Sequence, residues 1–161
     1  MGAGKTTTGR ELARLLGLTF TDLDDLIVDQ AGRSINEIFK KEGEAFFRKV
    51  EREVLARVAS QSGQVVATGG GIVLDPVNRE RIKASGMAIY LKTGLPVLWK
   101  RVQTKKDRPL LQTPRPEETL AELLRERAPF YEALADQSFL TDGKSPEAMA
   151  REIFTRSFEK R

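Results

Sequence analysis

The stretch Gly2-Ala3-Gly4-Lys5-Thr6-Thr7, directly after Met1, decides the fold of this 161-residue chain. It forms the end of the phosphate-binding motif G-x-x-x-x-G-K-[ST], in which backbone N–H groups of a glycine-rich turn surround phosphate oxygens. Lys5 is expected to reach the β- and γ-phosphates, and the Thr6 hydroxyl to bind Mg²⁺. A flexible basic N-terminus is the alternative interpretation, because the first glycine of the motif would precede Met1.

A phosphate loop has to open a helix, and residues 8–17 satisfy this condition. Leu12, Leu15 and Leu16 recur on one helical face, and Gly17 is a typical helix end. The helical pattern therefore favours phosphate binding over a flexible N-terminus.

The composition narrows the possible functions. The chain contains no Cys, which is typical of a cytoplasmic protein, and shows neither a signal peptide nor an apolar run of membrane-spanning length. With 27 Lys and Arg against 23 Asp and Glu, the net charge of +4 is modest and dispersed, so small anionic substrates fit better than nucleic acid. Because the chain has no His, proton transfer falls to a carboxylate, lysine, tyrosine or water.

Helices and strands alternate along the chain, which predicts a single α/β domain with a parallel sheet. Strands are expected at residues 18–21, 64–68, 87–91 and 138–141. Helices are expected at residues 25–31, 35–42, 44–60, 95–102 and 116–135, after Asp75-Pro76, and after the cap Ser145-Pro146-Glu147. A nucleotide-binding sheet of this size needs five strands, so one strand is lacking.

Two carboxylates, Asp22 and Asp24, follow the first predicted strand, where open α/β sheets place their ligands. Alternate strand residues point to the same face, so both carboxylates are expected to project into the crevice. One would hold Mg²⁺ and the other would accept a hydrogen bond from a substrate hydroxyl. The alternative is a helix N-cap formed by Asp24 or Asp25.

Gly69-Gly70-Gly71 follows a buried strand and predicts either a close approach to the backbone or a plain turn. Arg48 lies three residues before Glu51 on a predicted helix, so Glu51 would hold its guanidinium group. An ordinary surface ion pair has the same spacing.

In order and spacing, these motifs resemble the shikimate kinase family over the whole chain. The resemblance rests on the phosphate loop, the two aspartates, Phe47-Arg48-x-x-Glu51, the three glycines, Arg108-Pro109-Leu110-Leu111 and Glu126-Arg127-x-x-x-Tyr131. It implies a three-layer α/β/α P-loop kinase fold over residues 1–161, similar to nucleoside monophosphate kinases. It also implies ATP-dependent phosphorylation of the 3-hydroxyl of shikimate, a step towards chorismate and the aromatic amino acids.

By the same resemblance, Lys5, Asp24 and Arg108 are the expected catalytic residues. Thr6 and Asp22 would hold Mg²⁺. ATP would be bound by Gly2, Ala3, Gly4, Lys5, Thr6, Thr7, Arg101, Arg108 and Pro146. Shikimate would be bound by Asp24, Arg48, Gly69, Gly70, Gly71 and Arg127. Shikimate is a carboxylate with three hydroxyls, and two arginines with one aspartate suit those groups.

The resemblance places substrate-binding helices at about residues 24–60 and a lid at about 103–116. A basic loop that closes over ATP excludes water and stabilises charge; a solvated basic loop is the alternative. We expect a cytoplasmic monomer whose partner is the small molecule shikimate, with neither nucleic acid nor a membrane involved. A gluconate-kinase-like enzyme and a non-catalytic product are the competing functions.

The chain departs from the family at its start, because it lacks the central strand that precedes the phosphate loop. Such a strand buries about four large apolar side chains, worth roughly 6–12 kcal/mol, which equals the stability of a typical domain. We therefore expect the native protein to begin about ten or more residues upstream, with Met1 inside a loop of the form G-x-M-G-A-G-K-T.

Overall fold

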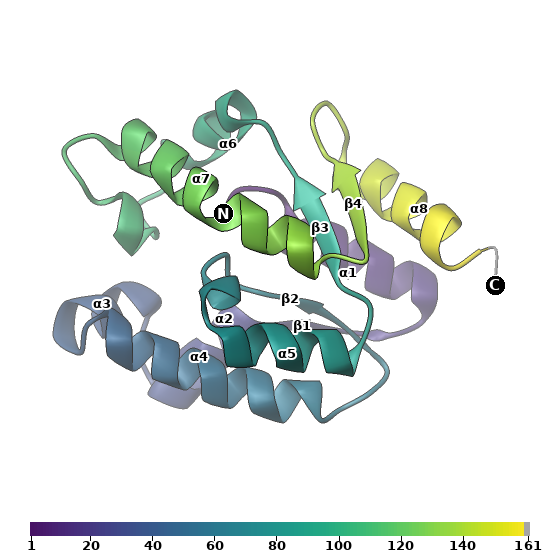
Figure 1. Cartoon of the computed structure of the whole chain (residues 1–161), viewed down its shortest axis with the longest axis horizontal. Helices are drawn as coiled ribbons and strands as arrows, with labels where there is room; N and C mark the ends of the chain where they lie inside the picture. Colours follow the sequence, from purple (N-terminus) through teal and green to yellow (C-terminus); the bar gives the residue numbers. More distant parts are fainter. Residues whose placement is uncertain (160–161) are drawn as a thin grey trace.

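The computed structural model describes residues 1–159, in which helices alternate with four short parallel strands (Figure 1). The strands are β1 (Thr19–Asp22), β2 (Gln64–Ala67), β3 (Ile89–Lys92) and β4 (Gln137–Leu140). The α-helices are α1 (Lys5–Leu16), α2 (Leu23–Ala31), α3 (Ile35–Lys41), α4 (Glu44–Ala59), α5 (Pro76–Ser85), α6 (Leu95–Val102), α7 (Pro116–Leu134) and α8 (Pro146–Ser157). Two 3₁₀ turns, η1 (Ile72–Leu74) and η2 (Pro109–Leu111), complete the list.

The four strands form two separate pairs. β1 runs parallel to β2, with Thr19 opposite Gln64, and β3 runs parallel to β4, with Ile89 opposite Gln137. Within residues 1–159, no backbone hydrogen bond joins β2 to β3. The predicted α/β class and the four strands are confirmed, but each strand is shifted by one or two residues or shortened, because pairing rather than hydrophobicity sets its ends.

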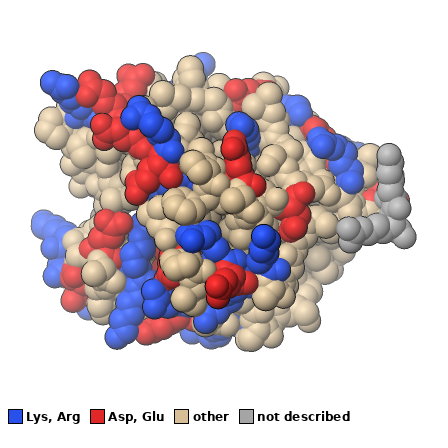
Figure 2. Space-filling model, in the orientation of Figure 1, with Lys and Arg blue, Asp and Glu red and all other residues tan. Residues whose placement is uncertain are grey.

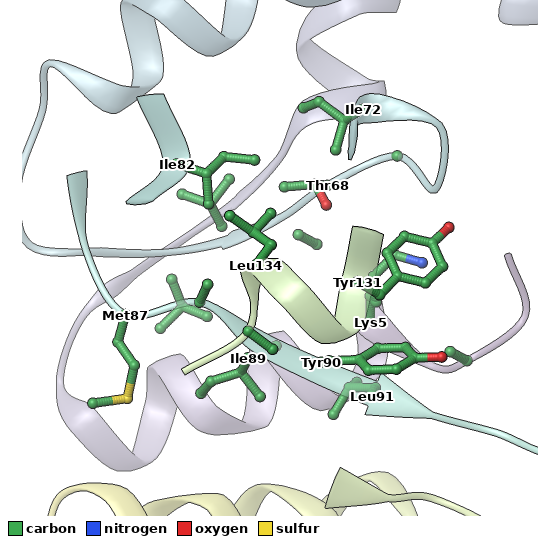
Figure 3. Close-up of a pocket in the computed structure, with 18 of the residues that line it drawn as sticks. Lys5, Thr68, Ile72, Ile82, Met87, Ile89, Tyr90, Leu91, Tyr131 and Leu134 are labelled. Atoms are coloured by element: carbon green, nitrogen blue, oxygen red, sulfur yellow. The ribbon is translucent and has the colours of Figure 1, made fainter. Parts of the chain in front are cut away.

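A cavity of about 500 Å³ lies between the inner edges of β2 and β3. Its wall is largely apolar, and Figure 3 shows Ile72, Ile82, Met87, Ile89 and Leu134 around it. A cavity of this size forgoes the van der Waals contacts that a filled interior provides. It lies between the two pairs of strands, where a further strand of the sheet would fit.

The buried apolar side chains form three clusters, and the two largest lie one towards each pair of strands. One apolar cluster packs α2 and α4 against η1, and it includes Leu23, Ile27 and Val54, which are fully buried. A second cluster joins α1 and α8 to β3 and β4 around Phe139 and Met149. Figure 1 shows the corresponding halves, with α3, α4 and α5 on the side of β1 and β2, and α6 and α7 on the side of β3.

Local sequence signals explain where the helices begin and end. Ser34 and Glu37 form the predicted capping box of α3, and Asp75 caps α5 through the Val77 N–H. Gly17 and Gly32 end α1 and α2 in the left-handed conformation, which glycine adopts without steric cost. The phosphate-loop helix begins at Lys5, so the flexible N-terminus is excluded.

No helix among residues 1–159 is both long and apolar enough to cross a lipid bilayer. On the face drawn in Figure 2, Lys and Arg side chains are interspersed with Asp and Glu side chains.

Candidate active site

A cleft of about 470 Å³ opens at the carboxyl ends of β1 and β2. Its lining contains every residue that the sequence analysis assigns to the site. From the phosphate loop it includes Gly2, Ala3, Gly4, Lys5, Thr6 and Thr7. From elsewhere it includes Asp22, Asp24, Arg48, Gly69, Gly70, Gly71, Arg101, Arg108, Arg127 and Pro146.

The phosphate loop needs its glycines for two different reasons. Gly4 caps α1 with a φ of 85°, a conformation that side-chain-bearing residues rarely adopt. Gly2 has a φ of 70°, and a Cβ there would lie 2.8 Å from Val102. Arg101 donates a hydrogen bond of 3.0 Å to the Gly2 carbonyl, so it holds the loop from α6. The first N–H groups of α1 have no partner within the helix, so they are available to an anion bound at this loop.

Lys5 begins α1 and lies within the cleft. Burial lowers the pKa of its ammonium group, while the nearby carboxylates of Asp24 and Asp22 raise it. An ammonium group between a helix N-terminus and two carboxylates fits phosphate oxygens that carry several negative charges.

Thr6 and Asp22 form the pair of oxygens expected at a magnesium site. The Thr6 hydroxyl donates a hydrogen bond of 2.7 Å to Asp22 Oδ2. Two protein oxygens beside a phosphate site suit Mg²⁺, which retains several waters and binds through one or two carboxylates together with substrate phosphates. No cluster of three acidic, His or Cys side chains that would hold a metal by itself occurs among the described residues.

The prediction that Asp22 and Asp24 both extend from a strand is wrong. β1 ends at Asp22, and Asp24 belongs to the first turn of α2. Asp22 is itself the N-cap, because its Oδ1 accepts a hydrogen bond of 3.0 Å from the Asp24 N–H, whereas the predicted cap was Asp24 or Asp25. Both carboxylates nevertheless line the cleft, since the cap turns the chain back at that point.

Asp24 is a partly buried carboxyl group in this cleft. Burial raises its pKa, and the charge of Asp22 adds to the effect, whereas Lys5 and Arg108 oppose it. A carboxyl group with a raised pKa gives a carboxylate that is a stronger base. Asp24 is therefore suited to accept a proton from a hydroxyl group.

Arg48 is held on α4 by two carboxylates. Its Nη1 donates to Glu51 Oε1 at 2.8 Å, and its Nη2 lies 3.2 Å from Glu44 Oε1. Glu51 is only 1% exposed, so it is no ordinary surface partner, and its burial raises its pKa although Arg48 lowers it. A Cβ at Gly71 would overlap the Arg48 guanidinium, which explains why glycine is required there.

The glycine turn packs between two arginines. Opposite Arg48, the buried Arg127 on α7 comes close to Gly70, whose Cβ would lie 3.4 Å from Arg127 Nη1. The Tyr131 hydroxyl donates a hydrogen bond of 2.5 Å to the Gly70 carbonyl. The cleft therefore offers two guanidinium groups beside the backbone of the glycine turn, an arrangement that suits a carboxylate.

The predicted lid connects α6 to α7 and contains η2. Arg108 precedes η2, is about a quarter exposed, and lies 3.9 Å from Asp107. Asn36 on α3 donates a hydrogen bond of 3.1 Å to the Lys106 carbonyl, so the lid rests on the side of the cleft formed by α3. Pro146 starts α8 and lines the cleft.

The sequence analysis gave no direct ligand role to Glu51, Tyr131 or Lys144. Glu51 and Lys144 line the cleft, and Tyr131 lies beside it at Gly70. Glu51 had the spacing of a surface pair, and only its burial distinguishes it. Tyr131 lies four residues after Arg127 on α7, so both share a helical face, and this spacing was the available signal. Lys144 also lines the cleft, and nothing in its local sequence indicates this.

Comparison with known proteins agrees with this geometry. The family model described as shikimate kinase matches residues 1–157. A shikimate kinase of Actinobacillus pleuropneumoniae is 45% identical over 153 residues, covering 95% of this chain and 88% of the relative. One of Stenotrophomonas maltophilia is 50% identical over 142 residues, covering 88% of this chain and 79% of the relative. Neither a gluconate kinase nor a non-catalytic product is favoured by these matches.

Solved structures agree with the fold as well. A shikimate kinase from Acinetobacter baumannii, in complex with shikimate, has a TM-score of 0.97 and 40% sequence identity. It covers 100% of this chain, which covers 90% of that structure. A shikimate kinase from Aquifex aeolicus has a TM-score of 0.84 and 34% identity, over 96% of this chain and 90% of that structure. A kinase cleft built on these motifs, matched over nearly the whole chain, places this protein in the shikimate kinase family.

Proposed function

We propose that this protein transfers the γ-phosphoryl group of ATP to the 3-hydroxyl of shikimate, giving shikimate 3-phosphate and ADP. The observation that carries the proposal is the single cleft in which a phosphate loop faces a glycine turn flanked by Arg48 and Arg127. The phosphate loop suits a nucleotide, and the two arginines suit a small carboxylate. Family membership and the shikimate complex of the Acinetobacter relative support the same substrate.

In the proposed reaction the substrate hydroxyl oxygen forms a bond to the γ-phosphorus, and the bond from that phosphorus to the β–γ bridging oxygen breaks. ADP leaves, and Asp24 accepts the hydroxyl proton. Because the transition state of phosphoryl transfer is loose, catalysis rests mainly on positioning and charge stabilisation. Lys5 and the α1 N-terminus act on the phosphates, and Arg108 acts on the charge that develops on the transferred group.

Mg²⁺ would be held by Thr6 and Asp22, and it supplies positive charge to the β- and γ-phosphates when bound. The Thr6–Asp22 hydrogen bond supports this assignment, because it brings both oxygens to one point beside the phosphate loop. Arg101 and Pro146 would contact adenine at the other end of the cleft. Arg48 and Arg127 would hold the carboxylate of shikimate, while Gly69, Gly70 and Gly71 allow the substrate to approach the backbone.

Residues 103–116 are proposed to act as a lid over the phosphates, and residues 24–60 as the substrate-binding part of the single domain. The Asn36–Lys106 hydrogen bond supports this assignment, because it joins the loop of residues 103–116 to α3, which lies within residues 24–60. A monomer and a cytoplasmic location stay predictions from the sequence.

A coupled assay of ADP release tests the proposal with the chain at a fixed concentration of ATP and Mg²⁺. We expect turnover with shikimate. With gluconate or a nucleoside monophosphate, kcat/KM should be at least 100-fold lower, which corresponds to a loss of about 2.7 kcal/mol of transition-state binding. Equal turnover with gluconate would mean that shikimate is not the specific substrate. The absence of ADP release with any acceptor would refute the proposed activity.

A further inference from the structure

Tyr131 is the point at which α7 is joined to the glycine turn. Its hydroxyl donates to the Gly70 carbonyl at 2.5 Å, across 61 residues of sequence. The ring packs against Tyr90 of β3, with the two ring centroids 5.1 Å apart. Figure 3 shows the two rings beside each other at one end of the cavity between the strand pairs. The Tyr131 ring is therefore packed in place, and its hydroxyl group donates its proton to the turn.

This hydrogen bond fixes the orientation of a peptide group in the active site. A trans peptide is planar, so the Gly70 carbonyl and the Gly71 N–H point in opposite directions. Glycines impose few limits on backbone rotation, so this turn would otherwise have several accessible orientations. Within residues 1–159 the Gly71 N–H makes no hydrogen bond, although this residue is buried. An oriented, unpartnered donor at the edge of the cleft is a group that a carboxylate can engage.

The same tyrosine also lies against one of the two arginines. Tyr131 follows Arg127 by four residues on α7, and a Cβ at Gly70 would lie 3.2 Å from the Tyr131 hydroxyl and 3.4 Å from Arg127 Nη1. Burial raises the pKa of the Tyr131 hydroxyl, although the Arg127 charge lowers it, so the group keeps its proton and stays a donor. One hydroxyl thus borders both the backbone donor and the guanidinium group.

We propose that Tyr131 is a positioning residue for the acceptor substrate, which holds the Gly70–Gly71 peptide so that the Gly71 N–H and Arg127 face the substrate carboxylate together. This inference rests on the proposed function and extends it to a residue outside the reacting groups. Tyr131 touches neither phosphate nor the reacting hydroxyl in this role. Its loss should therefore weaken binding of the acceptor rather than slow the chemical step.

The variant Tyr131→Phe removes one oxygen atom and keeps the ring packing. We expect KM for shikimate to rise about three- to tenfold, the effect of one lost neutral hydrogen bond. The values of kcat and of KM for ATP should stay within about twofold of the wild type. Tyr90→Phe is the matched control, because its ring contacts Tyr131 and its hydroxyl makes no hydrogen bond within residues 1–159. Its kinetics should match those of the wild type.

A second measurement needs no turnover. In NMR spectra of ¹⁵N-glycine-labelled protein without substrate, the Gly70 and Gly71 amide signals should move in Tyr131→Phe and stay in place in Tyr90→Phe. In the wild type, the Gly71 amide signal should also shift when shikimate saturates the protein, and an unmoved signal would overturn the inference even if Tyr131→Phe does not fold.

The two proposals fail in different ways. A wild-type chain that releases no ADP with shikimate refutes the proposed function, while the glycine signals of the two variants still decide whether Tyr131 holds the turn. An active Tyr131→Phe with an unchanged KM for shikimate overturns the inference. So do unmoved glycine signals in that variant, or a loss in kcat equal to the loss in affinity.

Discussion

Arg48 and Glu51 form an ion pair of 2.8 Å in which the carboxylate is almost completely buried and the guanidinium is a quarter exposed. Breaking a buried pair leaves an uncompensated charge, so Glu51 depends on Arg48 for its ionised form. All three nitrogens of the guanidinium donate hydrogen bonds, Nη1 to Glu51 and Nε and Nη2 to Glu44, and Arg48 lines the cleft. This relationship fixes the Arg48 side chain, which suits the carboxylate-binding role proposed for it.

Arg48→Lys should therefore weaken shikimate binding with little effect on ATP. A lysine cannot contact Glu51 and a substrate carboxylate with the two-point geometry of a guanidinium. The loss of one charge-assisted hydrogen bond, about 1.5–3 kcal/mol, corresponds to a rise of roughly 10- to 150-fold in KM for shikimate. Steady-state kinetics with each substrate varied in turn measures both values. Equal increases in the two KM values would mean that Arg48 serves the fold alone.

Arg108→Ala should lower kcat more than it changes shikimate affinity. A lid cation acts on charge that develops during transfer, and the expected loss in kcat is on the order of 10²-fold. Lys106, the neighbouring basic residue in the exposed lid, provides the comparison, because Lys106→Ala removes a charge outside the lining of the cleft. Single-turnover rates of both variants check this prediction. An unchanged rate for Arg108→Ala would mean that the loop is solvated and takes no part in phosphoryl transfer.

Asp24→Asn should abolish turnover and at the same time stabilise the fold. The amide keeps the size of the carboxyl group but accepts no proton, so we expect kcat below a tenth of the wild-type value, a barrier change above about 1.4 kcal/mol. Because burial raises the folded-state pKa of Asp24, the native protein binds the proton more tightly than the unfolded chain. The carboxyl therefore costs stability as the pH rises above its unfolded pKa.

Thermal unfolding of Asp24→Asn across pH checks this sign. The melting temperature should exceed that of the wild type at pH 7, and the difference should shrink as the pH falls towards the ordinary pKa of a carboxyl. The acid limb of the wild-type pH–rate profile should also lie above that ordinary pKa. A kcat above a tenth of the wild-type value would remove Asp24 from the proposed role.

Asp22→Asn should produce a defect that Mg²⁺ partly rescues. Asparagine caps helices as well as aspartate does, so α2 keeps its start, while the cation loses a charged ligand. We expect the Mg²⁺ concentration for half-maximal rate to rise about tenfold or more. A titration of Mg²⁺ at saturating ATP measures this for both aspartate variants. Rescue of Asp24→Asn instead of Asp22→Asn would exchange the two roles.

An apolar strand added before Met1 should stabilise the protein. The cavity between β2 and β3 is largely apolar and has unpaired strand edges on both sides. The charge of Lys5 and burial hold the pKa of the Met1 α-amino group well below its ordinary range, and a peptide bond there would remove that repulsion. A net gain of only about 3 kcal/mol would raise the melting temperature by roughly 6–12 °C.

The measurement compares the 161-residue chain with two chains extended before Met1. One carries six Val and Ile residues followed by Gly-x, and the other carries a Gly/Ser segment of the same length, which forms no strand. We expect stabilisation with the first segment only. The same melting temperature for both extensions would show that the cavity does not accept a strand.

The sequence by itself determined where the helices lie to within a few residues, and it singled out residues that the structure brings into one cleft. The helix Leu95–Val102 has the predicted bounds, and Ser34 and Glu37 form the predicted capping box. Such signals are local, because a cap or a helical face involves residues only a few positions apart. Glycine-rich and charged motifs likewise pointed to residues that the structure places in one cleft. Their individual roles stay proposals.

Only the tertiary structure decided how those pieces meet. It placed Asp22 as a cap and Asp24 on α2, where the sequence predicted two residues of one strand. It buried Glu51, whose spacing to Arg48 equals that of a surface pair, and it joined Tyr131 to Gly70 across 61 residues. It also separated β2 from β3 by a cavity. Burial and strand pairing depend on contacts between distant segments, so local sequence patterns leave them undetermined.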